Sequence, residues 1–354
     1  LSAVAKALRQ RRLRRGALDL DLPEAQIVLD QDDPNRVRQV VQSRPDTPIK
    51  RAYGLVEELM IAANEAVGRE FQRADEPTIW RIHPPPRPEA IDKLAAWMGA
   101  YGVQARPEEL ADERGMGRLV KRLQAHRAAR PLSYLVLRTL KQATYATTNA
   151  GHFGLASRAY LHFTSPIRRY PDLCVHRLLK EMLQRQGTAA GAPAERRPME
   201  LETLRELCKE STANERRAIE AEREVHRVYA ASLMRDRIGE EAAGLISGVA
   251  AFGFFVTLDD PFVEGLVKAE SLPRGLDFDA EGLRLFAPGG GVFSLGDRVH
   301  VRVTDTSVRR RQIDLELLDG ASAHEQDPGA PRPGRGARRS RQGGHERHKG
   351  KRQY

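Results

Sequence analysis

The sequence is poor in cysteine: Cys174 and Cys208 are the only two among 354 residues. Two thiols exclude a disulfide scaffold and a zinc site built from cysteines. They suit a reducing compartment, so we expect a cytoplasmic protein. The sequence also lacks a run of 18 apolar residues and a recognisable signal peptide. These absences argue against a membrane-spanning helix and against a membrane partner.

The positive charge of the chain, +10 overall, is concentrated at its two ends. With seven arginines, two lysines and one glutamate, residues 328–354 carry +8. Residues 1–15, with five arginines and one lysine, carry +6, which leaves residues 16–327 at −4. Any nucleic-acid binding by residues 16–327 must therefore come from a local arrangement of side chains and not from their net charge. The basic tail would add unspecific attraction to phosphate, although such charge runs are often simply solvated.

Helical periodicity dominates the first two thirds of the chain. Over residues 50–71, apolar residues recur at helical spacing and predict one apolar stripe: Val56, Met60, Ala63, Val67 and Phe71. A basic helix over 3–15 is expected to end at Gly16, because glycine favours the helix-ending conformation. A long charged helix is predicted over 199–237.

Beyond Gly239 the pattern changes to short strands. The strand-like segments are an alternating stretch at 244–258 that contains FGFFV, then EGLV at 264–267, GDRVHVRV at 296–303 and IDLEL at 313–317. Five strands in roughly 80 residues indicate a small closed barrel. In this order the segments resemble the S1-type RNA-binding module, an OB-fold, over 241–318. The last residues, 321–354, lack periodicity and are predicted to be disordered.

The stretch with most chemical information is GHFGLASRAYLHFTSPIRRYPDLCVHRLLK at 151–180. Thr164 and Ser165 are good helix caps, and Pro166 suits a first helical turn. A helix is therefore predicted over 166–185. Its free backbone N–H groups would attract an anion.

Two arginines follow this predicted helix start. Arg168 and Arg169 would lie in the first turn, where guanidinium groups beside free N–H groups form a phosphate clamp. Arg168, Asp172 and His176 are four residues apart and would share one helix face, so Asp172 could hold Arg168 in place. Such a pair is also common as a purely structural one. Nearby aromatic residues could stack on bases or belong to the core: Tyr145, Phe153, Tyr160 and Phe163.

The same stretch resembles the signature of the RNB family of exoribonucleases, and in particular its ribonuclease R type. The resemblance rests on GHFGLA, Tyr160 and HFTSPIRRYPDL followed by HR. It extends over about residues 1–320 through four further segments: GALDLDLPEAQIVLD at 16–30, LVEELMIAANE at 55–65, RIHPPP at 81–86 and NERRAIEAEREV at 214–225. It implies processive 3′→5′ hydrolysis of single-stranded or structured RNA to nucleoside 5′-monophosphates, with magnesium (Mg2+) as cofactor.

The resemblance also implies roles for single residues. Arg168 matches the arginine that contacts the scissile phosphate and would stabilise charge in the transition state. Arg169, one helix position further on, would also bind the substrate but would not face the same phosphate. Glu57 matches a glutamate that holds the nucleotide near the 3′ end, and Glu222 matches an acidic position of the long helix. Independently, Glu57 and Asn64 form a polar pair on a mostly apolar helix, which fits a ligand-facing seam or a solvent-exposed face.

In the barrel, Phe252 and Phe255 match exposed aromatic residues that stack on RNA. Lys268 occupies a position where the module often has histidine, and it would contact phosphate instead. Core packing is the alternative for the phenylalanines. With Phe254 between them, at least one of the three must be buried.

No metal ligand is assigned within this chain. The family binds its metal through a D-x-D-D-A motif early in the catalytic domain. Asp30, Asp32 and Asp33 look similar, but they are followed by a proline and lie downstream of GALDLDLPE, where the family has a hairpin turn. The magnesium ligands are therefore expected upstream of Leu1. Because the chain also starts with leucine rather than methionine, we expect the C-terminal portion of a longer enzyme.

The expected fold class is α+β, with three successive parts. Residues 1–238 would form the C-terminal portion of an RNB catalytic domain, 239–320 an S1-type barrel, and 321–354 a disordered basic tail. Three alternatives remain for the function: an exoribonuclease, a non-catalytic RNA-binding protein, and one subunit of a split enzyme whose partner is the missing N-terminal half.

Overall fold

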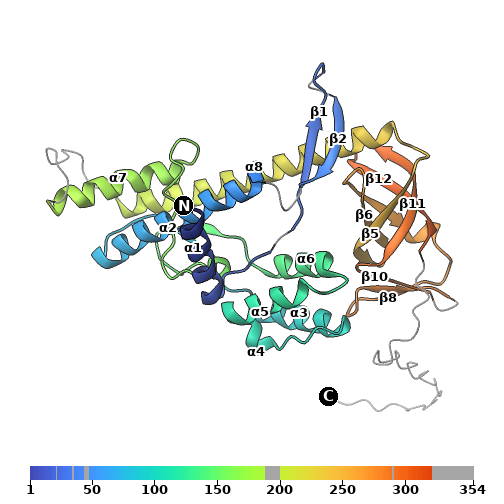
Figure 1. Ribbon diagram of the computed structural model, residues 1–354, viewed down its shortest axis with the longest axis horizontal. Helices are drawn as coiled ribbons and strands as arrows, with labels where there is room; N and C mark the ends of the chain where they lie inside the picture. The colour runs from blue at the N-terminus through green and yellow to red at the C-terminus, as the bar shows by residue number, and fades with distance from the viewer. Residues whose placement is uncertain (21, 34–35, 44–47, 188–199, 289–290, 321–354) are drawn as a thin grey trace, which may run out of the picture. The chain divides into compact units, whose positions relative to one another are not determined.

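The computed structural model describes residues 1–320, apart from 21, 34–35, 44–47, 188–199 and 289–290 (Figure 1). The predicted disordered tail, 321–354, lies outside the described residues. In the part of the chain that is described, no helix combines the length and the apolar character needed to cross a membrane.

Helices and short strands alternate up to Arg235. These elements are α1 (Ser2–Arg15), β1 (Ala25–Leu29), β2 (Val37–Gln42), α2 (Pro48–Ala74), β3 (Trp80–Ile82), α3 (Pro88–Ala100), α4 (Pro107–Leu110), α5 (Glu113–Leu123), α6 (Ala129–Thr139), β4 (Thr144–Ala146), the 3-10 helix η1 (Phe153–Leu155), α7 (Tyr170–Arg185) and α8 (Leu201–Arg235). The predicted basic helix and the long charged helix are confirmed by α1 and α8. Gly16 ends α1 in the left-handed conformation, with φ 111°.

The remaining elements are almost all strands. They are β5 (Glu241–Ala250), β6 (Gly253–Leu258), β7 (Glu264–Lys268), the 3-10 helix η2 (Ala269–Ser271), β8 (Asp277–Asp279), β9 (Arg284–Phe286), β10 (Val292–Ser294), β11 (Arg298–Ser307) and β12 (Gln312–Asp319).

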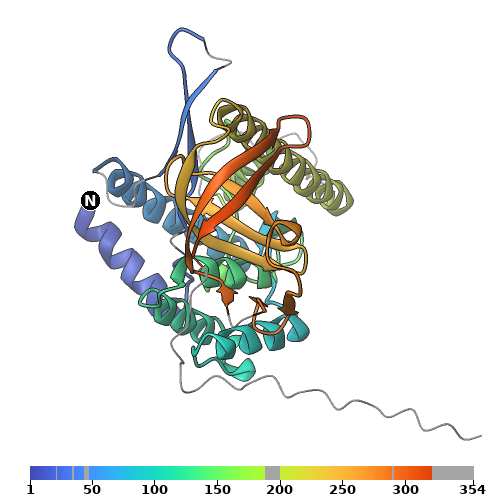
Figure 2. The same cartoon turned by 90° about the vertical axis from the view of Figure 1, so that its right-hand side faces the viewer.

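Five of these strands close into a barrel in the order β11-β12-β7-β6-β5, which confirms the predicted barrel (Figure 2). Neighbouring strands run antiparallel except β12 and β7, which are parallel. Alternate residues of β6 point inward: Phe254, Val256 and Leu258 are fully buried. Strands β8, β9 and β10 form a separate three-stranded sheet inserted between β7 and β11.

Helix α1 lies against α2 through one buried and one partly buried ion pair. The Arg12 guanidinium donates to Glu58 at 2.5 Å, and that of Arg15 donates to Glu65 at 2.5 Å. Arg12 and Glu58 are 7% and 3% exposed. A buried charge is tolerated only when it is paired and hydrogen-bonded. Part of the positive charge of the N-terminal helix is therefore neutralised inside the protein.

The same pairing explains why α2 differs from the predicted apolar stripe. Phe71, at the end of the stripe, is buried, but Val56, at its start, is 51% exposed. The side of α2 that is buried near Val56 instead carries Glu58, which receives Arg12. The stripe prediction was wrong at this end, because helical spacing alone does not indicate that a neighbouring helix supplies arginines.

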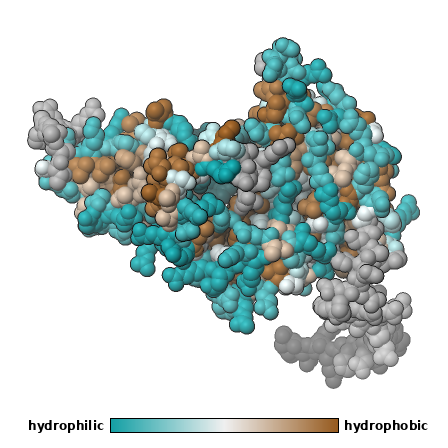
Figure 3. Space-filling view, viewed as in Figure 1, coloured by the Kyte–Doolittle hydropathy of each residue, from teal (hydrophilic) through white to brown (hydrophobic). Residues whose placement is uncertain are grey.

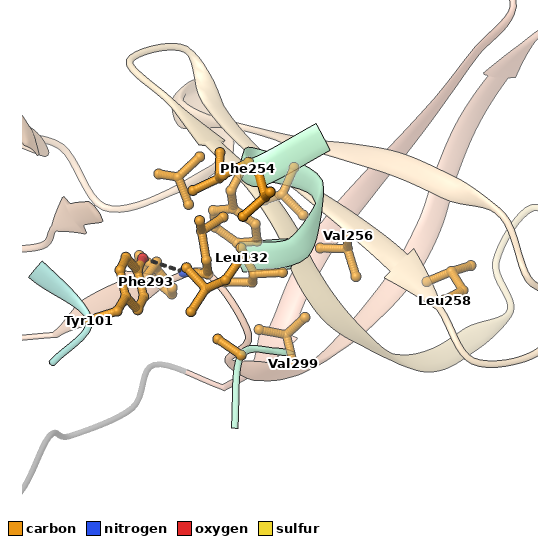
Figure 4. Close-up of a cluster of buried hydrophobic side chains, with 14 of the residues drawn as sticks. Tyr101, Leu132, Phe254, Val256, Leu258, Phe293 and Val299 are labelled. Atoms are coloured by element: carbon orange, nitrogen blue, oxygen red, sulfur yellow. Dashed lines mark hydrogen bonds between the residues drawn. The ribbon is translucent and has the colours of Figure 1, made fainter. Parts of the chain in front are cut away.

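The largest hydrophobic core is continuous from helices α3, α5 and α6 into the barrel. Figure 4 shows Leu132 of α6 beside Phe254 and Phe293, which belong to β6 and β10. A second core includes Phe71 of α2 and the two cysteines, Cys174 and Cys208, which are free and buried. Both cysteines are thus core residues.

Candidate functional site

The chain from Ser165 to Arg169 forms a turn, and α7 begins only at Tyr170. The Ser165 carbonyl accepts hydrogen bonds from the backbone N–H groups of Arg168 at 3.3 Å and Arg169 at 3.0 Å. The prediction that the helix starts at Pro166 was wrong. Pro171, not Pro166, occupies the first turn, where its missing N–H is harmless.

Asp172 holds this turn in place. Its carboxylate is completely buried, and Oδ2 accepts hydrogen bonds from the Ser165 N–H at 2.8 Å and from the Arg169 guanidinium at 2.8 Å. The expectation that Asp172 holds Arg168 was wrong, because Arg168 precedes the helix and does not share its face. Arg168 is exposed, and among the described residues it has no ion pair.

The segment before the turn is anchored to α2 and α7. Asn64 of α2 accepts a hydrogen bond from the Phe163 N–H at 2.9 Å and donates to the Tyr160 hydroxyl at 3.1 Å. The His176 ring stacks on Phe163, with centroids 3.9 Å apart, and its Nε2 lies 2.8 Å from the Phe163 carbonyl. Asn64 is 3% exposed, so it supports the turn and does not form a ligand-facing seam with Glu57.

Most of the aromatic residues proposed for base stacking are core residues. Tyr145, Phe153 and Tyr160 are 4–8% exposed and are not available to RNA. Tyr145 and Tyr160 instead pack edge to face with His162, with ring centroids 5.6 and 5.8 Å apart. The Tyr145 hydroxyl lies 2.9 Å from His162 Nδ1. Burial raises the pKa of Tyr145 to about 12, so its hydroxyl stays protonated.

The histidines of this cluster are neutral, with His83 buried and His152 and His162 half-buried. Burial, assisted by the neighbouring Arg169 and Arg81, lowers the pKa of His162 to about 2. Burial, assisted by His83 and Arg81, lowers the pKa of His152 to about 3. His83 is also satisfied as a neutral ring, because Nδ1 accepts from the Gly154 N–H at 3.0 Å while Nε2 lies 2.6 Å from the Lys141 carbonyl.

The two strongly shifted histidines predict acid sensitivity. Below about pH 6.5 the unfolded chain takes up a proton on each of His152 and His162, and the folded chain does not. The free energy of unfolding should therefore decrease as the pH falls, by about 1.4 kcal/mol per pH unit for each histidine. Denaturant unfolding at a series of pH values measures this slope. In the His162→Asn variant this slope should be smaller by the contribution of one histidine. A variant slope equal to that of the unchanged chain would contradict the prediction.

The two predicted acidic contacts are both exposed. Glu57 lies on α2 beside the buried Glu58, and Glu222 lies on α8. Another α8 carboxylate, Glu215, instead pairs with Arg81 at 2.6 Å. Sequence reasoning missed Glu58 and Glu215 as arginine partners. Only the three-residue spacing of the arginines along α1 could have indicated the first of these pairs.

In the barrel, Phe254 and Phe255 point to opposite faces of β6, and Phe252 lies in the turn before that strand. Phe254 is fully buried and stacks on Phe293, with centroids 5.1 Å apart. Phe252 is 58% exposed and contacts the half-buried Phe255 edge to face at 6.0 Å. The expectation that at least one of the three is buried is confirmed. Lys268, at the end of β7, pairs with Asp314 of β12 at 2.6 Å.

Replacing Phe252 or Phe255 with alanine is expected to weaken binding of single-stranded RNA. The expected loss is about 1–3 kcal/mol for each stacked base, because each ring offers an apolar face to a base. Fluorescence anisotropy with labelled RNA measures the loss. Val256→Ala is the matched control, since it shortens another fully buried side chain of β6 and should lower thermal stability while leaving the affinity of the folded protein unchanged. Equal RNA affinity in all three variants would argue against stacking at this surface.

The residues present do not fit a magnesium site. Within the described ranges, no group of three or more histidine, cysteine, aspartate or glutamate side chains could hold a metal ion. Asp30 instead caps the β1–β2 turn, where its Oδ1 accepts hydrogen bonds from the N–H groups of Asp32 at 2.9 Å and Asp33 at 3.3 Å. These hydrogen bonds lower the pKa of Asp30.

Two family models match the chain: the RNB domain over residues 1–185 and the S1 RNA binding domain over 235–318. Ribonuclease R of Escherichia coli K12 is 36% identical over 322 residues, which are 90% of this chain and 39% of that protein. Ribonuclease R of Aquifex aeolicus is 35% identical over 330 residues, 92% of this chain and 44% of that protein. The chain thus spans about two fifths of the length of these curated relatives.

Solved structures agree with this relationship. The apo form of Mycoplasma genitalium RNase R superposes with a TM-score of 0.79 at 25% identity, over 90% of this chain and 48% of that chain. The same protein in complex with ribose-methylated single-stranded RNA gives 0.78 at 24% identity, over the same shares of both chains. With its α+β region up to α8 and the closed five-stranded barrel after it, the chain belongs to the RNB family and carries an S1 domain behind its RNB region.

Proposed function

We propose that this chain is the RNA-binding, C-terminal portion of a 3′→5′ exoribonuclease of the ribonuclease R type. Such an enzyme would hydrolyse RNA processively to nucleoside 5′-monophosphates. The observation that carries the proposal is the turn before α7, where Asp172 fixes the backbone of Ser165 and the side chain of Arg169 while Arg168 stays exposed. A fixed backbone that presents one free guanidinium suits recognition of a phosphate.

Each polar residue predicted for the site has a role in this proposal. Arg168 contacts the scissile phosphate and stabilises the charge that develops on it. Arg169 contributes positive charge beside it, although its guanidinium also serves Asp172. Glu57 and Glu222 bind the nucleotide, since exposed carboxylates accept hydrogen bonds from ribose hydroxyl groups.

The barrel acts as a second RNA contact. Phe252 and Phe255 stack on bases, and Lys268 contacts a phosphate beside them. The structures of Mycoplasma genitalium RNase R with single-stranded and with double-stranded RNA support RNA as the substrate. We retain the division into an RNB portion at 1–238, an S1 barrel at 239–320 and a tail at 321–354.

Magnesium belongs to the proposal only through residues outside this chain. Its ligands are expected upstream of Leu1, in the part of the RNB domain that would complete the site. Exposed apolar side chains at the start of α1, on α2 and in the turn before α7 offer a surface for that part: Leu1, Val4, Ile49, Val56 and Ile167. Figure 3 shows apolar surface near α1 and α7. A cytoplasmic location is also proposed, because both cysteines are free.

The chain alone is expected to bind RNA without degrading it. The physical reason is that the binding residues are present, whereas metal-assisted hydrolysis needs a carboxylate cluster that the described residues do not supply. Purified chain is incubated with 3′-labelled single-stranded RNA and magnesium, and both binding and release of labelled mononucleotides are measured. Release that Arg168→Ala abolishes would overturn the prediction, and failure to bind RNA would overturn the proposed function.

The remaining alternatives are separated by the DNA just upstream of Leu1. An in-frame D-x-D-D-A motif there indicates a longer enzyme, and the same motif in a separate short gene indicates a split enzyme. If the motif is found in neither place, the chain is an RNA-binding protein without hydrolytic activity.

A further inference from the structure

The inserted sheet of the barrel binds directly to helices of the RNB region. Tyr101, which follows α3, is 7% exposed, and its hydroxyl accepts a hydrogen bond from the Leu295 N–H at 3.0 Å and lies 3.3 Å from the Leu283 carbonyl. Burial raises the pKa of Tyr101 to about 12, so the hydroxyl remains a donor to Leu283. One hydroxyl thus joins two segments of the S1 domain to the end of α3.

Arg284 of β9 strengthens this contact from the other side. Its guanidinium lies over the Tyr101 ring, 5.2 Å from the centroid, and donates to the Ala100 carbonyl. The α3 residue Trp97 also donates from Nε1 to the Ala280 carbonyl at 3.3 Å. These contacts are directional, unlike the apolar core around them, so they specify one orientation of the inserted sheet.

A close backbone approach completes the contact. Gly296, between β10 and β11, has φ 85°, and a Cβ built there would lie 2.6 Å from the Cβ of Ala128, just before α6. Any side chain at 296 would therefore push α6 and the barrel apart. Only glycine combines this backbone conformation with this distance.

The same contact reaches the candidate RNA surface. Phe254 stacks on Phe293 of the inserted sheet and packs beside Leu132 of α6 (Figure 4). Phe252 and Phe255 form the outward aromatic pair. Phe254 lies between them in the sequence, directly before Phe255. The position of that pair is thus tied to α6 through one intervening, fully buried ring.

We propose that Tyr101 and Gly296 form a latch that holds the S1 barrel in one position against the RNB region, so that one RNA strand binds both surfaces at once. Tyr101 is a positioning residue, because it touches the barrel and not the RNA. The proposal rests on the proposed function, since it requires RNA binding by both regions. Two linked sites that are held at a compatible spacing bind a common ligand more tightly than either site alone.

The experiment compares a short and a long RNA. A single-stranded RNA of about five nucleotides fits one OB-fold site, and one of about 25 nucleotides exceeds the ~4–16 nucleotides of such a site and can reach the second surface. Dissociation constants are measured by anisotropy for the unchanged chain, Tyr101→Phe and Gly296→Ala. Gly239→Ala is the matched control, because Gly239 has a similar φ of 92° and open space around its Cβ position. Tyr134→Phe is the control for loss of a tyrosine hydroxyl from α6.

The unchanged chain should bind the long RNA about a hundredfold more tightly than the short one. In Tyr101→Phe and Gly296→Ala the long RNA should lose about tenfold or more of its affinity, while the short RNA changes less than about twofold. Both controls should keep the original ratio. An unchanged ratio in the two latch variants, or equal losses for both RNAs in both variants, would overturn the latch. If the unchanged chain binds neither RNA, the proposed function itself fails and the latch falls with it.

Discussion

Replacing Arg168 with lysine is expected to slow RNA hydrolysis by on the order of a hundredfold or more in a longer form of the chain that carries the metal-binding aspartates. Lysine keeps the charge but loses the planar fork with which a guanidinium matches a phosphate. RNA affinity should hardly change if Arg168 acts mainly on the transition state. Single-turnover rates on 3′-labelled RNA and equilibrium binding are measured in parallel.

Arg169 supplies the matched comparison. Its guanidinium donates to the buried Asp172, so Arg169→Lys should lower the thermal stability of the protein. The same variant should slow hydrolysis much less than Arg168→Lys does. Equal losses of rate in the two variants would contradict the separate role of Arg168. A loss confined to RNA affinity would identify Arg168 as a binding residue only.

Removing the Asp172 carboxylate is expected to cause the largest loss of stability. Asp172→Ala leaves the Arg169 guanidinium and the Ser165 N–H without their acceptor in a fully buried position. Breaking a buried pair in this way costs about 3–5 kcal/mol. Denaturant unfolding of the isolated chain measures the change without any need for activity.

The control is an ion pair of similar length at the surface. Arg185 and Glu76 lie 2.9 Å apart with side chains 55% and 25% exposed. Arg185→Ala should therefore cost less than about 1 kcal/mol, since exposed pairs contribute little. If Asp172→Ala were no more destabilising than Arg185→Ala, the turn would owe its conformation to other contacts.

Features that depend on neighbours along the chain were predictable. The end of α1 at Gly16 follows from the conformational freedom of glycine, and the length of α8 follows from a 35-residue stretch without glycine or proline. The barrel was predictable for a related reason. The two-residue alternation of β6 sends Phe254 inward and leaves Phe255 toward the surface, whereas Phe252 lies in the turn before β6 and is exposed for that reason.

The start of α7 was not predictable in the same way. Thr164, Ser165 and Pro166 are favourable helix-start residues, yet the helix begins four residues after Pro166. The Asp172 carboxylate reaches back to the Ser165 N–H and stabilises a turn that a local cap would not require. Tertiary contacts thus override local capping preferences, which are worth only about 1 kcal/mol.

The sequence by itself determined the family and the order of the RNB and S1 regions, because these depend on local motifs. Only the tertiary structure decided which charges meet. Arg12 pairs with Glu58 across 46 residues, and Arg81 pairs with Glu215 across 134. Spacing along a chain restricts contacts within one helix or strand, whereas the partner of a buried charge is set by which surfaces pack together. The same packing joins the barrel to α3 and α6 through Tyr101 and Gly296.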